Sequence, residues 1–277
     1  MEQERPDGES QEPGDRKPLP PPRIYGIVAR EAQICVIFRR GPSKYVQTLR
    51  WNTKTDEITP GQWLRARIYE KDGDLSPDGQ WMTYCASRHG GLRSGEQHYT
   101  VVSWTPYLKA LALWFHRNPW TGGALFESNS KILLNTESGS FDPDPDHPCR
   151  LETAPLDVPR EEHKILRARL ERDGWTSSGS PKQITFEREV SGFLLRHEFS
   201  NESSKFMLRN PAGESRPLPF EWLDVDCTGQ IVAAREGKLW KASAESLFSD
   251  NVSEVADLAK YQYEPVPAPE WAARWEK

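Results

Sequence analysis

Two short segments that lie far apart in the chain carry the same turn sequence, and this repeat constrains the fold more than any other feature. Residues 74–81 read DLSPDGQW and residues 224–231 read DVDCTGQI, so Asp, Gly and Gln keep the same phase. In the first copy Pro77 favours a φ of about −65°, Gly79 accepts a positive φ, and Asp78 can bond to its own backbone. Each copy leads into an apolar segment, so the repeat predicts a tight turn between two antiparallel strands.

Weaker turn signals extend this repeat along the chain. Turns are expected near residues 32, 79, 130 and 229 and between 174 and 180, a spacing of about 50 residues with several short strands in each unit. That period is typical of propeller blades. We therefore predict an all-β fold, a β-propeller of five blades, with four or six blades as alternatives. A pair of β-sandwiches would also contain many short strands but would not repeat one turn at this interval.

The composition agrees with a strand-rich chain. The 277 residues include 11 Trp, 8 Tyr and 10 Phe but 3 Met, and the 36% hydrophobic content is enough to build a core. Apolar residues at helical spacing are rare, and only residues 254–260 and 270–277 read as short helices. Residues 63–69 alternate strictly, which predicts one strand with four side chains on a single face: Trp63, Arg65, Arg67 and Tyr69.

The first 22 residues differ from the rest of the chain. Residues 1–22 are rich in proline and charge, contain almost nothing apolar, and end in PLPPP. Such a segment cannot bury enough surface to offset its ordering entropy, so we expect a disordered tail followed by a propeller domain over residues 23–277. The N-terminus has no apolar signal core, and no run approaches the ~18 apolar residues of a spanning helix. A cytoplasmic protein without membrane contact is expected.

Charge, cysteine spacing and motif content argue against several classes of function. The net charge of −5 comes from mixed charges, so no nucleic-acid partner is expected. Cys35 and Cys85 lie in apolar runs, and no C-x-x-C spacing is present, which favours buried reduced thiols over a metal site. The sequence has no G-x-S-x-G elbow, no metal-binding histidine spacing and no glycine-rich phosphate loop. No cofactor is therefore expected.

The first copy of the turn also carries a family resemblance. Residues 74–84, DLSPDGQWMTY, resemble the blade motif of TolB-type, WD-like β-propeller repeats, and residues 224–234 match it in part. Residues 37–44 and 61–70 look like segments of a bacterial family of uncharacterised proteins. The resemblance implies a propeller fold and carries no activity. Because periplasmic TolB-type proteins have an export signal, a role in the cell envelope is not implied.

A basic cluster interleaved with aromatic residues is the main candidate binding site. Charge combined with ring stacking at such a cluster suits a phosphate, an acidic peptide or single-stranded nucleic acid. Its members are Arg39, Arg40, Lys44, Trp63, Arg65 and Arg67. The simpler interpretation is a solvated hairpin whose arginines pair with nearby acids, namely Glu31, Asp56 and Glu70.

An acidic run is a second candidate. Residues 142–147 read DPDPDH, and carboxylates at alternate positions suit Ca²⁺. The run lacks the glycine turn and distal Glu of an EF-hand loop, however, and its prolines stiffen it. We interpret it as a solvated loop and predict no metal site.

No motif in the sequence identifies a catalysed reaction. Asp74 and Asp224 occupy equivalent repeat positions, so we expect them to hold the turn. We therefore expect a non-catalytic scaffold or ligand-binding module for a protein or peptide partner, with Trp120 as one anchor. The alternative is a glycoside-type hydrolase with a pair of carboxylates roughly 5–9 Å apart at the central channel. A third possibility is a ligand sensor that uses the arginines of the basic cluster.

Overall fold

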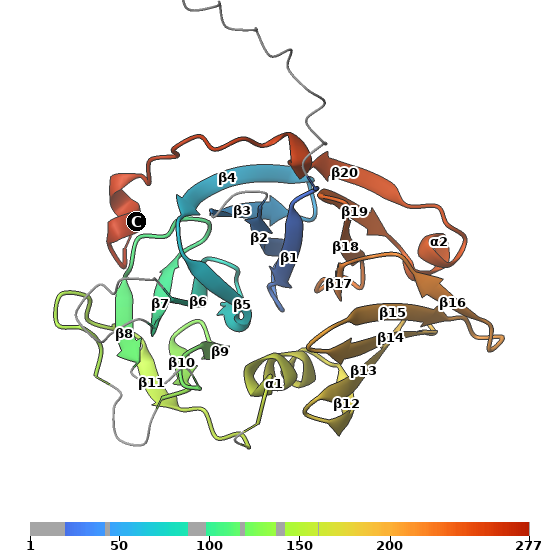
Figure 1. The fold of residues 1–277 in the computed structure, drawn as a ribbon, viewed down its shortest axis with the longest axis horizontal. Coiled ribbons are helices and arrows are strands. Elements are labelled where there is room, and N and C mark those ends of the chain that lie inside the picture. The colour runs from blue at the N-terminus through green and yellow to red at the C-terminus, as the bar shows by residue number, and fades with distance from the viewer. Residues whose placement is uncertain are drawn as a thin grey trace, which may run out of the picture.

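The structure is a ring of five sheets, as the turn repeat predicted (Figure 1). It is a computed structural model, and it describes residues 20–41, 45–87, 98–116, 120–136, 142–159 and 161–276. Nearly all of the predicted tail at residues 1–22 lies outside these ranges. Within them, no helix is both long and apolar enough to cross a membrane.

The first two blades are four-stranded antiparallel sheets built from consecutive strands. Blade 1 contains β1 (Arg23–Val28), β2 (Ile34–Arg40), β3 (Val46–Asn52) and β4 (Glu57–Leu64). Blade 2 contains β5 (Arg67–Leu75), β6 (Trp81–Ser87), β7 (His98–Trp104) and β8 (Ala112–His116). Cys35 on β2 and Cys85 on β6 are buried free thiols, as predicted.

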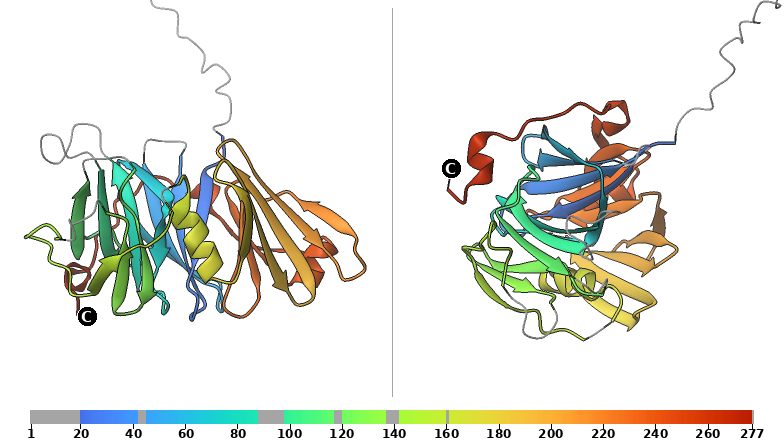
Figure 2. Two further views of the ribbon diagram at one scale, coloured as in Figure 1. Left: turned by 90° about the horizontal axis from the view of Figure 1, so that it is seen from below. Right: turned by 60° about the vertical axis from the view of Figure 1, so that its left-hand side comes forward.

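Blade 3 is smaller and is followed by a helix. Its described strands are β9 (Ala124–Ser128), β10 (Lys131–Leu134) and β11 (Glu152–Pro155), and β11 pairs with β10 in parallel. The helix α1 (Lys164–Arg172) then packs against β5, β9 and β12. Figures 1 and 2 show α1 among the strands between blades 3 and 4.

The last two blades are antiparallel again. Blade 4 contains β12 (Thr176–Ser180), β13 (Gln183–Val190), β14 (Phe193–Ser200), β15 (Ser204–Arg209) and β16 (Ser215–Leu218). Blade 5 contains β17 (Trp222–Val225), β18 (Ile231–Arg235), β19 (Lys238–Ala242) and β20 (Ser253–Asp257), with α2 (Ala244–Phe248) between its last two strands. The 3₁₀ turns η1 (Leu258–Lys260) and η2 (Glu270–Ala273) follow.

The two copies of the repeated turn adopt the same backbone. Gly79 and Gly229 have φ values of 71° and 83°, and each donates its N–H to the carbonyl three residues earlier, of Ser76 or Asp226. The carboxylates that brace the turns come from different positions: Asp78 accepts from Ser76 Oγ at 2.7 Å, and Asp226 accepts from the Thr228 N–H at 2.9 Å. The repeat is therefore a blade-forming turn. The carboxylates that stabilise it are those of Asp78 and Asp226, and not those of Asp74 and Asp224, with which the two copies begin.

Two predictions of local structure were wrong. Residues 63–69 do not form one strand, because β4 ends at Leu64 and β5 begins at Arg67, and the two-residue link joins different blades. Residues 254–257 are strand and not helix, since they pair with β19. The turn expected between 174 and 180 is found at both ends of that range: Gly174 has a positive φ just after α1, and the β12–β13 hairpin turns between Ser180 and Gln183. Helix α1 itself was not predicted, because a buried Arg169 takes an apolar position on its packed face.

The ring closes through side chains and not through a shared sheet. Arg39 on β2 is buried and donates to the carbonyl oxygens of Leu258 and Tyr261 at 2.7 and 2.6 Å. Thr53 Oγ1 donates to Asp226 Oδ2 at 2.7 Å, and Lys241 pairs with Asp56 at 2.6 Å. These bonds join blade 1 to blade 5.

The C-terminal segment makes aromatic contacts with blade 2 through Trp271 and Trp275, which we call the aromatic clasp. From β20 it runs past blade 1 to blade 2 (Figure 1). There Trp271 packs edge-on against Trp104 at 5.7 Å between ring centroids, and Trp275 packs against Trp81 at 5.6 Å. The Trp104 indole donates to the Arg274 carbonyl at 2.6 Å. The clasp therefore ties the end of the chain to the second blade.

Replacing Trp271 by Ala should destabilise the ring. Loss of a half-buried indole and its edge contacts predicts a free energy of unfolding lower by roughly 1–3 kcal/mol, measured by denaturant titration. Trp271→Phe keeps a ring against Trp104 and should lose about half as much. Equal stability of the wild type and Trp271→Ala would show that the clasp does not contribute.

Candidate functional site

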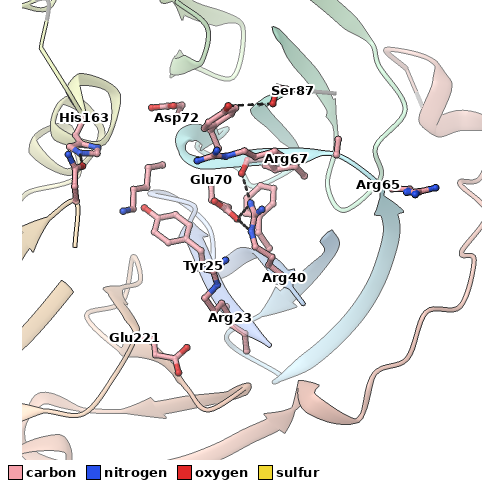
Figure 3. A pocket seen from close by; sticks show the side chains of 17 residues that line it. Arg23, Tyr25, Arg40, Arg65, Arg67, Glu70, Asp72, Ser87, His163 and Glu221 are labelled. Atoms are coloured by element: carbon pink, nitrogen blue, oxygen red, sulfur yellow. Dashed lines mark hydrogen bonds and ion pairs between the residues drawn. The ribbon is translucent and has the colours of Figure 1, made fainter. Parts of the chain in front are cut away.

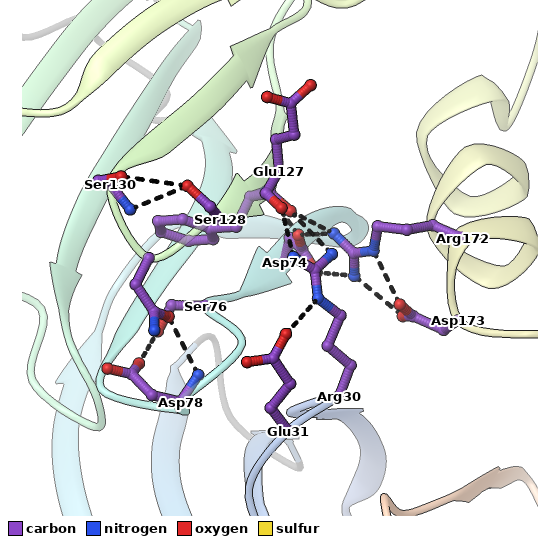
Figure 4. A network of polar contacts seen from close by, with 12 residues as sticks. Arg30, Glu31, Asp74, Ser76, Asp78, Glu127, Ser128, Ser130, Arg172 and Asp173 are labelled. Atoms are coloured by element: carbon purple, nitrogen blue, oxygen red, sulfur yellow. Dashed lines mark hydrogen bonds and ion pairs between the residues drawn. The ribbon is translucent and has the colours of Figure 1, made fainter.

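Two arginines of α1 reach from the helix to neighbouring blades. Arg172 donates to both oxygens of Asp74 at 2.5 and 3.0 Å, and to both oxygens of Asp173 at 2.8 and 2.9 Å (Figure 4). It also donates to the carbonyl oxygen of Phe126 on β9 at 2.9 Å. Arg169 donates to the carbonyl oxygen of Gly73 and to the Tyr25 hydroxyl. The two side chains thus join α1 to β1, β5 and β9.

Asp74 is an interblade contact and does not hold the turn, which corrects our expectation. Its carboxylate is completely buried and accepts the N–H of Phe126 at 2.7 Å in addition to the bonds from Arg172. Burial acts to lower the pKa of Arg172, but the adjacent Asp74 and Asp173 outweigh it and raise that pKa. Arg172 is therefore held in its charged form, and its guanidinium is engaged by both carboxylates.

A large cavity opens beside this network. It has a volume of about 1270 Å³ and is bounded mainly by β1, β2 and β5, with contributions from the α1 approach and from blades 4 and 5 (Figure 3). We call it the channel mouth. Five basic side chains line it, against three acidic ones. The basic residues are Arg23, Arg40, Arg65, Arg67 and Lys71, and the acidic ones are Glu70, Asp72 and Glu221.

The structure separates the members of the predicted basic cluster. Arg40 lines the mouth but pairs with Glu70 at 2.5 Å, as the solvated-hairpin interpretation expected. Arg67 lies over the Tyr69 ring, 4.8 Å from its centroid. Arg65 also lines the mouth, although Figure 3 shows it apart from the others.

The remaining candidates lie elsewhere. Arg39 is buried by the ring-closing bonds and stands 5.4 Å from the centroid of Trp63, which in turn packs against Tyr263. Trp120 is 69% exposed and does not line the mouth. Lys44 lies outside the described residues. Successive side chains of a strand point to opposite faces, so Arg39 lies in the ring closure and Arg40 lines the mouth.

Sequence reasoning missed at least five residues of the mouth. Arg23, Tyr25, Lys71, Asp72 and Glu221 all line it, yet none was singled out. One signal was available: Glu70, Asp72 and Asp74 alternate directly before the repeated turn, and alternation places side chains on one face of a strand. No sequence pattern indicated that β1 lies beside β5.

The charges of the mouth are unequally compensated. Burial raises the pKa of Asp72 to about 6, against the effect of Arg169 and two lysines, and Glu70 is paired with Arg40. Burial also lowers the pKa of Lys71, although Glu70 and Asp72 oppose the shift. Within the described ranges, the side chains of Arg23, Arg65 and Arg67 have no carboxylate partner. The mouth is therefore suited to an anion.

A second, smaller cavity adjoins the mouth. Its volume is about 110 Å³, and Tyr25, Lys71 and Glu221 line both spaces. We call it the side chamber. Its other lining residues come from α1 and blades 4 and 5: Leu166, Leu170, Trp175, His197, Phe199, Ser204, Phe206, Trp222, Leu223 and Asp224.

Two buried titratable groups line the side chamber. His197 stacks on Phe206 with ring centroids 4.2 Å apart, and its Nε2 lies 2.6 Å from Ser204 Oγ. Burial and the nearby Lys71 lower its pKa to about 3, so the ring is neutral near pH 7. Burial raises the pKa of Asp224 to about 6, and Asp173 adds to the rise. The Val225 N–H, Arg188 and Arg169 act in the opposite direction.

The acidic run is a loop in the structure. Asp144 is buried, and its Oδ1 accepts the N–H of Asp146 at 3.0 Å, while His147 Nδ1 lies 3.5 Å away. In the described part of the chain, no group of three or more His, Cys, Asp or Glu residues is placed to hold a metal ion.

Removing Arg172 should destabilise the fold strongly. Arg172→Met leaves the buried Asp74 carboxylate without its main counter-charge, which predicts a loss of about 3–5 kcal/mol in the free energy of unfolding. Adding Asp74→Asn to this variant removes the buried charge and should restore part of the loss. Denaturant titration of the three variants measures both effects, and additive losses in the double variant would contradict the pairing.

Asp224 should lower stability at neutral pH. A carboxyl group whose pKa is raised on folding stabilises the fold below its unfolded pKa, and that contribution is lost as pH rises through about 6. Asp224→Asn should therefore be more stable than the wild type at pH 7, by up to about 3 kcal/mol, and equal to it near pH 4. Unfolding at both values tests this, with the exposed Glu264→Gln as control. A pH-independent difference would contradict it.

Comparison with known proteins adds the fold alone. No family model matches the chain, and no curated protein matches its sequence. A solved structure of an uncharacterised protein from Listeria monocytogenes aligns with 85% of this chain and 83% of its own, at 13% identity and a TM-score of 0.34. A chain of a mitotic checkpoint complex aligns with 94% of this chain and 89% of its own, at 9% identity and a TM-score of 0.33. An acylaminoacyl peptidase of Pyrococcus horikoshii aligns with 84% of this chain and 45% of its own, at 10% identity and a TM-score of 0.32. The protein is a β-propeller with distant structural similarity to these proteins.

Proposed function

We propose that the protein is a non-catalytic ligand-binding module whose channel mouth takes a carboxylate group. The observation that carries this is the excess of basic side chains around a cavity of about 1270 Å³. Arg23, Arg65 and Arg67 are exposed and have no carboxylate partner among the described residues. Arginine forks bind carboxylates in a bidentate manner, so this rim suits such a ligand.

The carboxylate has two possible sources. It can belong to an acidic segment of a partner protein, or to a free small molecule. Both use the same arginines, and a cavity of this size admits either. The ring of packed blades supports the proposal, because it holds the rim residues of blades 1 and 2 in fixed positions.

The hydrolase alternative has less support. It needs two carboxylates that are free to act as acid and base. Asp74 and Asp173 share Arg172, and Glu70 is engaged by Arg40. Asp72, Glu221 and Asp224, however, line the cavities without an ion pair among the described residues. We favour binding over glycoside hydrolysis because basic side chains outnumber acidic ones at the mouth.

We also propose a relationship to TolB-type propeller repeats and a cytoplasmic location. The DLSPDGQWMTY segment supports a TolB-type, WD-like origin of the blades. The buried free thiols of Cys35 and Cys85 are compatible with a reducing compartment such as the cytoplasm.

Calorimetric titration tests the proposal. The probes are pentanoate and a hexaglutamate peptide, so that the two sources are compared directly. Wild-type protein should bind at least one of them with an affinity that falls as salt increases, since the rim charges are exposed. The double variant Arg23→Glu/Arg67→Glu should weaken binding by roughly tenfold or more.

Arg209→Glu serves as a charge-reversal control. Arg209 is exposed at the end of β15 and does not line the mouth, so its reversal changes the net charge by half as much as the double variant does without changing the rim. Equal weakening in this variant would show only a long-range charge effect. Absence of binding for both probes would contradict the proposed function.

A further inference from the structure

The side chamber has a basic side chain where it meets the channel mouth and an acidic side chain further in. Lys71 stands at the junction, because it lines both the channel mouth and the chamber. Asp224 lines the chamber but not the mouth. Glu221 lines both spaces as well, so a ligand that passes the junction meets the Lys71 ammonium group and Glu221 first and the Asp224 carboxylate further in.

Asp224 is a buried acid with little compensation. Its residue is 7% exposed, and among the described residues the only hydrogen bond to its carboxylate comes from the N–H of Val225, at 2.8 Å. The two nearest arginines are committed elsewhere: Arg169 to Gly73 and Tyr25, and Arg188 to the Val225 carbonyl. A carboxylate in these surroundings costs stability unless a cation reaches it.

Among the described residues, Lys71 is a cation without an ion-pair partner, as Asp224 is an acid without one. Its Nζ lies 4.1 Å from the centroid of the Phe199 ring, and no carboxylate of the described chain lies within ion-pair distance of it. Glu70, its neighbour in sequence, is held by Arg40. The ammonium group thus rests on an aromatic face with no anion beside it.

The rest of the chamber adds one further charged group, Glu221, whose Oε1 accepts the N–H of Glu236 at 3.2 Å, and the apolar residues set its size. Trp175, Phe206 and Trp222 are buried apolar walls, and His197 is bonded to Ser204. A water molecule occupies about 30 Å³ in the liquid, so a volume of about 110 Å³ holds a polar head and a few methylene groups. Aromatic walls of this kind suit an ammonium group.

We propose that the side chamber and its junction bind a short amino carboxylate, with the carboxylate at Lys71 and the ammonium group at Asp224. This deepens the proposed function and rests on it, since the carboxylate is the group that the channel mouth receives. The ligand places an anion beside Lys71 and a cation beside Asp224, neither of which has an ion-pair partner among the described residues. The half-buried ammonium group and the buried carboxylate each gain a charge-assisted partner in one step.

Titration with matched probes tests the proposal. The probes are the unbranched ω-amino carboxylates of three to six carbons, and for each length the carboxylate without the amine and the alkylamine without the carboxylate. One length of amino carboxylate should bind at least about tenfold more tightly than both of its matched partners.

Two variants assign the ends of the ligand. Asp224→Asn should bring the affinity of the amino carboxylate down to that of the plain carboxylate. Lys71→Met should bring it down to that of the alkylamine. Glu264→Gln and Lys205→Met, both at exposed positions, are the matched controls and should leave the affinities unchanged. Far-ultraviolet circular dichroism and the melting temperature confirm that each variant is folded.

The outcomes separate the two proposals. Carboxylates that bind without any gain from the amine overturn the zwitterion inference and leave the proposed function standing. A gain that persists in Asp224→Asn also overturns it, because the ammonium group then binds elsewhere. If no probe of any class binds, the inference is wrong, and the hexaglutamate titration then decides whether the mouth binds a carboxylate.

Discussion

The double fork of Arg172 onto Asp74 and Asp173 is the contact on which the centre of the molecule depends. It fastens α1 to β5 and, through the Phe126 carbonyl, to β9. Blade 3 shows three strands in the described ranges, and the helix packs where the ring passes from this blade to blade 4. An ion pair so deeply buried needs all of its bonds, because a lone charge there is costly. The stability of this ion pair therefore depends on the position of α1, and the position of α1 depends on the ion pair.

The channel mouth and side chamber follow from this placement. Arg169, on the same helix, holds the Tyr25 hydroxyl, and Tyr25 lines both cavities. Leu166 and Leu170 of α1 form one wall of the chamber. Asp224, which faces that wall from blade 5, stays weakly compensated because the nearby arginines are engaged. A residue that lowers stability at neutral pH and lines a cavity is a candidate for ligand binding.

Part of this structure could be predicted from the sequence. Pro77, Gly79 and Gly229 impose a turn by their own backbone preferences, so the blade period was visible without coordinates. The buried state of Cys35 and Cys85 followed from their apolar surroundings. The prediction for residues 63–69 failed because two strand ends joined by a short link show the same alternation as one strand. Helix α1 was missed because Arg169 hides its apolar face, and only the partners Gly73 and Tyr25 make a buried arginine acceptable there.

The sequence by itself determined the repeated turn and the strand-rich blades and favoured five of them, since these depend on local backbone preference and on side chains close along the chain. The tertiary structure decided which charged residues meet. Arg39 and Arg40 are adjacent in sequence, yet one closes the ring and the other lines the mouth, because successive side chains of a strand point to opposite faces. The roles of Asp74 and Asp224 diverged for a related reason. Equivalent positions in the repeat face different neighbours: Asp74 faces the guanidinium of Arg172, and Asp224 faces an open chamber.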